Sequence, residues 1–138
     1  MEVLLVEPGQ YAKITTIDRS LEGMQRAVGG YIEAIYPFED AVAIICDEEG
    51  KINGKPLNRA LRDDEGRIWD AVAGTFFVCG LGEYSFDDLP KELQDKYEKL
   101  FHQPEVFVRM SKGVVAIPTE PERKAMQKRS PQSLDFEK

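Results

Sequence analysis

Reactive side chains are scarce in this sequence. It contains two cysteines, Cys46 and Cys79, and one histidine, His102, among 138 residues. The cysteines lie in separate apolar runs that have neither a metal-binding spacing nor a redox pair, so we expect both to be buried free thiols. Neither a Gly-x-Ser-x-Gly elbow nor a phosphate-binding loop is present. These absences predict a protein that is not an enzyme and that uses no metal or cofactor.

Long apolar runs and an N-terminal targeting signal are also missing. Residues 1–7 carry no basic region, and their apolar run is too short for a signal peptide. No other run approaches the length that crosses a membrane. We therefore expect a cytoplasmic protein in a reducing compartment.

Basic residues are in deficit. The chain has 18 lysines and arginines against 25 aspartates and glutamates, and up to residue 117 the count is 13 against 21. Because an acidic body repels phosphate backbones, direct binding to nucleic acid is not expected. The acidic clusters at 47–49, 63–65 and 87–88 could instead mimic DNA. Two of the three stand directly before a glycine, however, and fit hairpin turns better.

Strand-like segments make up most of what the sequence does contain. Strands are expected at residues 3–6, 11–17, 31–36, 41–46, 75–79, 106–108 and 114–117, the first two and the last two as hairpins. The continuously apolar segments 41–46 and 75–79 fit strands that are buried on both faces in the middle of a sheet. Residues 56–61 suggest a short helical turn opened by Pro56, and residues 67–73 either a strand or an irregular segment.

Two further segments have the apolar periodicity of amphipathic helices. The first begins at Asp18 or Ser20 and ends at a glycine pair, and the second follows Pro90. Polar residues dominate after residue 117. The sequence thus predicts an α+β fold, with a mainly antiparallel sheet and both helices packed on one side of it. We expect one domain over residues 1–117 and a flexible polar tail over 118–138.

The glycine pair, Gly29-Gly30, separates the first helix from the following strand. Glycine adopts positive φ without steric cost, and its missing Cβ lets another group approach the backbone closely. The pair is therefore either a sharp helix stop or a seat for a small polar ligand.

Three motifs resemble those of a family of small, uncharacterised proteins common in phages, plasmids and conjugative elements. The motifs are VGGYIE at 28–33, PLNRA at 56–60 and AGTFF at 73–77. The family is a domain of unknown function, so the resemblance implies a genetic context, that of a mobile-element accessory protein. Such proteins often counter host defence. The resemblance therefore implies a non-catalytic anti-defence protein that binds a host protein in the host cytoplasm through an acidic face, Trp69 or the tail.

The alternative hypothesis is a small-molecule sponge that sequesters a nucleotide-like signal, such as a cyclic nucleotide. Arginine offers a planar fork for phosphate, and asparagine can read a base edge. The ligand-binding residues predicted on this hypothesis are Gly29, Gly30, Tyr31, Glu33, Asn58, Arg59, Thr75 and Phe76. The competing structural interpretation is that Asn58 and Arg59 cap a turn and pair with Glu33 or Asp70, with Tyr31 and Phe76 in the core.

Two other possibilities rest on fewer residues. Trp69 lies among polar residues and is either an interface hot spot or a plug for the core beneath its loop. Exposed sheet edges could also pair copies of the chain into a homo-oligomer. An enzyme would need a carboxylate pair, with candidates Glu33, Asp40, Asp47 and Asp70.

Overall fold

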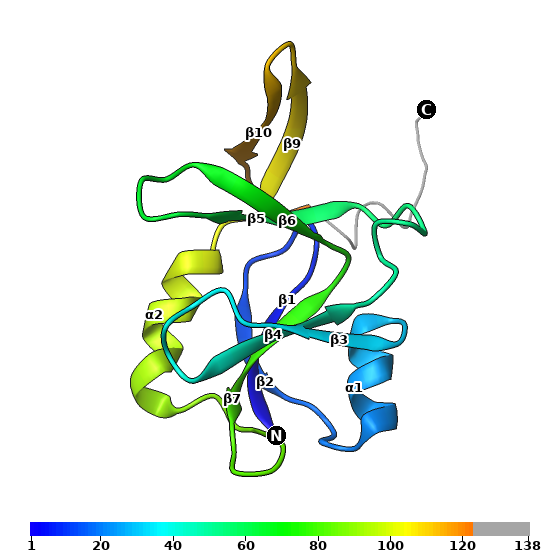
Figure 1. The fold of residues 1–138 in the computed structure, drawn as a ribbon, viewed down its shortest axis with the longest axis vertical. Helices are drawn as coiled ribbons and strands as arrows, with labels where there is room; N and C mark the ends of the chain where they lie inside the picture. Colours follow the sequence, from blue (N-terminus) through cyan, green and yellow to red (C-terminus); the bar gives the residue numbers. More distant parts are fainter. Residues whose placement is uncertain (123–138) are drawn as a thin grey trace.

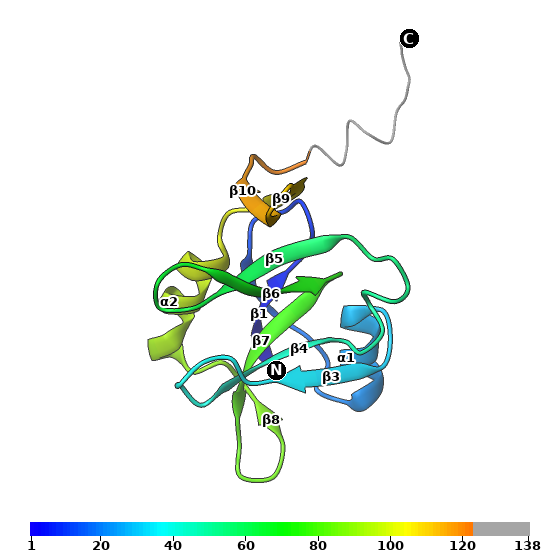
Figure 2. The same cartoon turned by 45° about the horizontal axis from the view of Figure 1, so that its top comes forward.

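A six-stranded antiparallel sheet forms the centre of the fold (Figures 1 and 2). It is seen in a computed structural model that describes residues 1–122. The strands of this sheet are β1 (Glu2–Val6), β2 (Lys13–Thr16), β3 (Ile32–Ile35), β4 (Val42–Asp47), β7 (Phe76–Leu81) and β8 (Phe86–Asp87). The main path runs β2-β1-β7-β4-β3, and β8 pairs with β7. The prediction of an α+β fold with a mainly antiparallel sheet is confirmed.

The two continuously apolar segments become the interior strands β7 and β4. All six residues of β4 are buried, as are the first five of β7. Successive side chains of a strand point to opposite faces, so such a run requires cover on both sides of the sheet. The prediction that both segments are central strands is confirmed.

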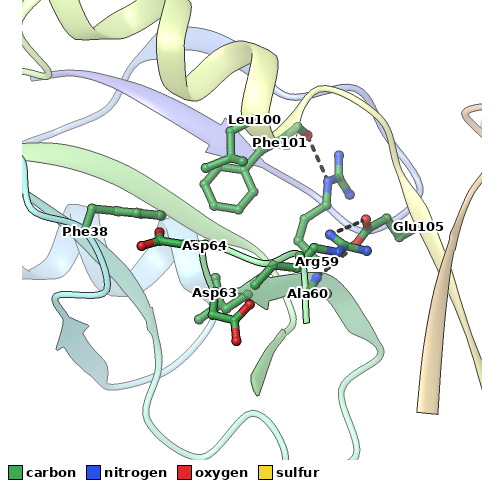
Figure 3. A pocket seen from close by; sticks show the side chains of 11 residues that line it. Phe38, Arg59, Ala60, Asp63, Asp64, Leu100, Phe101 and Glu105 are labelled. Carbon is green, nitrogen blue, oxygen red and sulfur yellow. Dashed lines mark hydrogen bonds and ion pairs between the residues drawn. The ribbon is translucent and has the colours of Figure 1, made fainter. Parts of the chain in front are cut away.

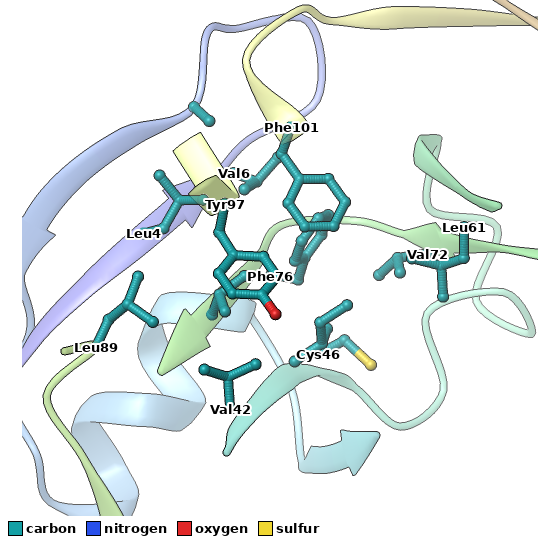
Figure 4. Close-up of a cluster of buried hydrophobic side chains, with 13 residues drawn as sticks. Leu4, Val6, Val42, Cys46, Leu61, Val72, Phe76, Leu89, Tyr97 and Phe101 are labelled. Carbon is teal, nitrogen blue, oxygen red and sulfur yellow. The ribbon is translucent and has the colours of Figure 1, made fainter. Parts of the chain in front are cut away.

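The helices α1 (Leu21–Val28) and α2 (Lys91–Phe101) cover opposite faces of the sheet. On one face, Met24 and Val28 of α1 pack in a cluster with Val3, Ala43, Ile45, Phe77 and Cys79. On the other, Tyr97 and Phe101 of α2 pack with Leu4, Val6, Val42, Ile44, Phe76 and Val78 (Figure 4). The expectation that both helices share one side was wrong. The interior strands are apolar on both faces, and each face needs its own layer.

A second, two-stranded sheet pairs β5 (Leu57–Arg62) with β6 (Ile68–Ala73). Its inward side chains Leu61 and Val72 join the cluster beneath α2. The helical turn expected at 56–61 was wrong, because burial of Leu61 against this cluster outweighs the local signal from Pro56. The acidic cluster at 63–65 does form the turn between the two strands, as expected.

A third sheet is the hairpin of β9 (Glu105–Met110) and β10 (Gly113–Pro118), which projects from the body (Figure 1). After it, the backbone N–H of Glu122 donates to Gly9 O over 2.8 Å, so the chain runs back along the body as far as residue 122. The rest of the predicted flexible tail, residues 123–138, lies outside the described residues. Within residues 1–122 no helix has the length and apolar character needed to cross a membrane.

Candidate functional site

The seat formed by the glycine pair is filled by the protein's own Asp47. Gly29 ends α1 in the left-handed conformation, with a φ of 75°. Gly30 has no positive φ, but a Cβ built on it would lie 2.5 Å from Oδ1 of Asp47. The pair is therefore a helix stop followed by a close approach, and the group that approaches is an internal carboxylate rather than a ligand.

Lys55 holds this carboxylate against the end of α1. Its Nζ lies 2.6 Å from Oδ2 of Asp47 and donates to Val28 O (3.0 Å) and Gly29 O (2.9 Å). Three acceptors satisfy all three donors of an ammonium group. The bond from Lys55, with a further one from the backbone N–H of Glu49, lowers the pKa of Asp47, although burial of the carboxylate acts the other way. We call this arrangement the Lys55 clamp.

Asn58 and Gly74 bring the other two motifs into contact with the clamp. The Asn58 side chain is buried, and its Nδ2 donates to Val6 O and to Gly74 O, each over 2.9 Å. Gly74 has a φ of 78°, and a Cβ there would lie 2.8 Å from Cδ of Lys55. The VGGYIE, PLNRA and AGTFF segments thus lie side by side next to the Lys55 clamp.

Arg59 is the largest fully buried side chain of the described residues. Its Nε donates to Phe101 O (2.9 Å), Nη1 to Asn58 Oδ1 (2.9 Å) and O (3.4 Å), and Nη2 to Gln10 O (2.6 Å) and His102 O (3.5 Å). These acceptors match the five N–H donors of a guanidinium. Burial lowers the pKa of Arg59 to about 10, so it stays protonated at neutral pH. Arg59 therefore caps the last carbonyls of α2 and ties them to β5 and to the β1–β2 connection.

The structure separates the remaining residues of the predicted ligand pocket. Phe76 is fully buried in the core, whereas Tyr31 and Glu33 are exposed. Gly29 and Thr75 line one shallow cavity of about 360 Å³, and Gly30 and Tyr31 line another of about 430 Å³. Neither cavity is lined by Asn58 or Arg59. The predicted pocket around Asn58 and Arg59 was wrong, because β5 directs both side chains inward. Their predicted pairing with Glu33 or Asp70 was wrong as well, because they bond backbone carbonyls and each other.

Three of the four candidate catalytic carboxylates are held in ion pairs. Asp47 belongs to the Lys55 clamp, Asp70 pairs with Lys51 over 2.5 Å, and Asp40 accepts from Lys96 and from the Tyr97 hydroxyl, each over 2.6 Å. Glu33, Asp47 and Asp70 do line one cavity of about 260 Å³ between β3, β4 and β6. Within residues 1–122 no group of three or more histidines, cysteines or carboxylates could hold a metal ion.

A different cavity, of about 320 Å³, opens between α2, the β5–β6 hairpin and Phe38 (Figure 3). Its apolar walls are Phe38, Leu61, Leu100 and Phe101, and its acidic rim is Asp63, Asp64 and Glu105. We call it the acidic slot. The rings of Phe38 and Phe101 meet edge to face, with 6.1 Å between their centroids. Its residues come from three distant parts of the chain, so no local sequence pattern could have indicated it.

The cations that line the acidic slot are already bonded. Arg59 caps α2, and Arg62 Nη1 lies 3.0 Å from Oε2 of Glu105. The Asp63 carboxylate accepts from the backbone N–H of Arg67, which lowers its pKa, and pairs with the Arg67 side chain. The side chain of Asp64 makes no hydrogen bond or ion pair within residues 1–122. The slot therefore suits an apolar stem that ends in a cation, and it disfavours a phosphate.

Trp69 lies on β6 and is 55% exposed. The interpretation that it fills the core was therefore wrong. Its role as an interface residue stays a prediction.

Both cysteines should resist modification in the native protein. Cys46 on β4 and Cys79 on β7 are buried free thiols, as expected, and burial raises their pKa values to about 11 and about 12. Because the thiolate is the nucleophile, we expect an aromatic disulfide reagent at neutral pH to titrate neither thiol until denaturant is added. Rapid titration of either one in the folded protein would contradict the packing of β4 and β7.

The part of the chain that matches a known family contains the main sheet and both helices. A family model described as a domain of unknown function, DUF3846, matches residues 1–102, which end just before the β9–β10 hairpin. No curated protein and no solved structure matches the chain. The family match spans the main sheet, both helices, the Lys55 clamp and Arg59, and it covers well over half of the 138 residues. The chain therefore belongs to the DUF3846 family of proteins of unknown function.

Proposed function

We propose that this protein is a non-catalytic accessory protein of a mobile genetic element, and that it opposes host defence by binding a host protein. The observation that carries the proposal is the acidic slot. Its apolar walls and Asp64, which has no partner within residues 1–122, are suited to a lysine or arginine side chain presented by that protein. The mobile-element setting rests on the resemblance of the three motifs and is an argument by analogy.

The chemistry of the slot fits both parts of a basic side chain, the apolar stem and the charged head. The aliphatic stem of lysine or arginine packs on apolar walls while its charged head reaches a polar rim. Aromatic rings such as those of Phe38 and Phe101 attract a cation, and Asp64 can accept a charge-assisted hydrogen bond from it. One seated side chain is only part of an interface, however. The exposed Trp69, on the β5–β6 hairpin that forms one wall of the slot, offers the aromatic anchor typical of binding hot spots.

The acidic clusters support recognition at the slot better than a broad acidic face. Asp63 and Glu65 pair with Arg67, Asp87 and Asp88 pair with Arg19, and Asp47 is buried in the Lys55 clamp. Much of the acidity is therefore offset locally. A DNA-like surface would need these charges free and aligned.

Sequestration of a nucleotide-like signal is the alternative proposal, with less support. It needs a cation for phosphate, but Lys55 and Arg59 use all their donors inside the protein. A panel of cyclic and linear nucleotides in a thermal shift assay tests it directly. A ligand present at 100 times its dissociation constant stabilises the folded state by about 2.7 kcal/mol, so a clear shift would favour the sponge.

Reversal of the charge at Asp64 should abolish partner binding without unfolding the protein. We expect tagged wild-type protein to capture one stoichiometric host protein from lysate, and Asp64→Lys to bind it at least about tenfold more weakly. Asp95→Lys, at an exposed position of α2 outside the slot, makes the same charge change and should keep the partner. Absence of a stoichiometric partner, or equal loss in both variants, would contradict the proposed function.

A further inference from the structure

The β9–β10 hairpin has one face made only of apolar side chains. Side chains alternate along a strand, so every second residue of β9 shares a face with its register partners on β10. One of the two faces consists of Val106, Val108, Met110, Val115 and Ile117, which we call the apolar face. Four of its five side chains are exposed, with Met110 at 54% and both Val106 and Ile117 at 49%.

Such a face requires a cover. A two-stranded hairpin alone is at best marginally stable in water, and contiguous exposed apolar surface marks an interaction site. The hairpin projects away from the helices and the main sheet (Figure 1), and within residues 1–122 the apolar face stays largely open. The cover must therefore come from outside the described part of the chain.

The two ends of the hairpin are complementary to each other. At the tip, the exposed Met110 lies near Lys112 of the turn, which is not ion-paired within residues 1–122. Arg109 shares the opposite face with Val114. At the base lies a groove of about 460 Å³, which we call the base groove. Its apolar lining includes Pro8, Pro56, Leu57 and Val106. Its carboxylates are Glu120, Glu122 and Glu105, of which Glu105 is already paired with Arg62. An apolar groove with an acidic rim matches an apolar tip that carries a cation.

We propose that a second copy of this chain covers the apolar face. The two hairpins pack antiparallel about a two-fold axis, apolar face on apolar face, and the tip of each copy lies in the base groove of the other. A two-fold interface uses the same patch on both copies, so the contact between the tip of one copy and the base groove of the other forms twice. Each strand of the hairpin has six residues and spans about 20 Å, which brings tip and base into line. The inference does not depend on the acidic slot or on a host partner.

The neighbours Val115 and Val114 provide a matched test, because both are 41% exposed and they point to opposite faces of β10. We expect sedimentation analysis of the full chain to show a dimer at micromolar concentration. Val115→Glu should weaken it at least about 100-fold, because the interface would bury an unpaired charge. Val114→Glu should leave it intact. Lys112→Glu should weaken the dimer less than Val115→Glu does, and the dissociation constant of the wild-type dimer should increase with salt concentration.

Each result bears on the proposal. A wild-type chain that is monomeric at about 100 µM would overturn it, because a contact that weak would leave the apolar face uncovered in most copies. Equal dimerisation of the Val114→Glu and Val115→Glu variants would overturn it too, because the contact would then lie elsewhere.

Cross-linking supplies a second readout in case Val115→Glu fails to fold. Residue 115 lies near the middle of the apolar face, where the two-fold axis would pass, and the native cysteines are buried. A short bis-maleimide should link Val115→Cys to its copy in high yield and Val114→Cys hardly at all. Equal yields for the two variants would contradict the arrangement.

Discussion

Arg59→Met should destabilise the protein by about 3–5 kcal/mol, a large part of the 5–15 kcal/mol that holds a typical domain together. Methionine can replace the apolar stem of the side chain but none of its hydrogen bonds. The carbonyls of Gln10 and Phe101 and the side-chain oxygen of Asn58 would lose the donors that Arg59 provides, and each unsatisfied buried group costs about 1–3 kcal/mol. Urea denaturation followed by circular dichroism measures the change.

Arg67→Met is the matched control for this experiment. The Arg67 side chain is 72% exposed and pairs only with acidic side chains of its own turn. Exposed ion pairs contribute about 0–1 kcal/mol, so this variant should unfold close to the wild type. If Arg59→Met also unfolds like the wild type, Arg59 does not support the fold and its assignment to the interior fails.

Gly30→Ala should destabilise the protein by about 2–3 kcal/mol. The new methyl group would lie 2.5 Å from Oδ1 of Asp47. That carboxylate cannot move aside easily, since Lys55 and the backbone N–H of Glu49 hold it. Forcing extra volume into a packed site typically costs about 1–3 kcal/mol, and weakening of the Lys55 clamp adds to this. Thermal or urea unfolding gives the value.

The sign of the Gly30 effect is informative. Gly30 has no positive φ. Without the contact to Asp47, alanine would therefore stabilise the protein by about 0.4–1 kcal/mol, because it reduces the conformational entropy of the unfolded chain. Gly54→Ala shows the backbone effect alone. Gly54 has a φ of 76° and nothing within 4 Å of a built Cβ, so strain of about 1–2 kcal/mol is expected there. A stabilising Gly30→Ala would show that Asp47 does not occupy the seat.

Most elements of the fold could be predicted from local sequence patterns. The buried runs at β4 and β7, the glycine stop of α1 and the terminal hairpin were all predictable, because each depends on residues close together in the chain. Two errors had non-local causes. The helices separate to opposite faces because both faces of the interior strands are apolar. β5 replaces the expected helical turn because Leu61 packs against the cluster beneath α2.

The candidate site was less predictable than the fold. The structure brings the three segments close together, but residue type alone did not distinguish an arginine that binds ligand from one that caps a helix. That distinction depends on whether the guanidinium meets carbonyls of its own chain, and those belong to Gln10, Phe101 and His102, far away in sequence. The acidic slot arises from equally distant segments.

The three segments around Gly30, Asn58 and Gly74 form an internal scaffold, and we propose that binding takes place elsewhere on the surface. The most direct test is a double-mutant cycle between Gly30 and Asp47, measured as the free energy of unfolding. In the Asp47→Ala background the added methyl group meets no carboxylate, so Gly30→Ala should become neutral or stabilising, with an interaction energy of at least about 2 kcal/mol between the two sites. If Gly30→Ala costs the same in both backgrounds, the glycine does not seat Asp47, and the motif is open to a ligand after all.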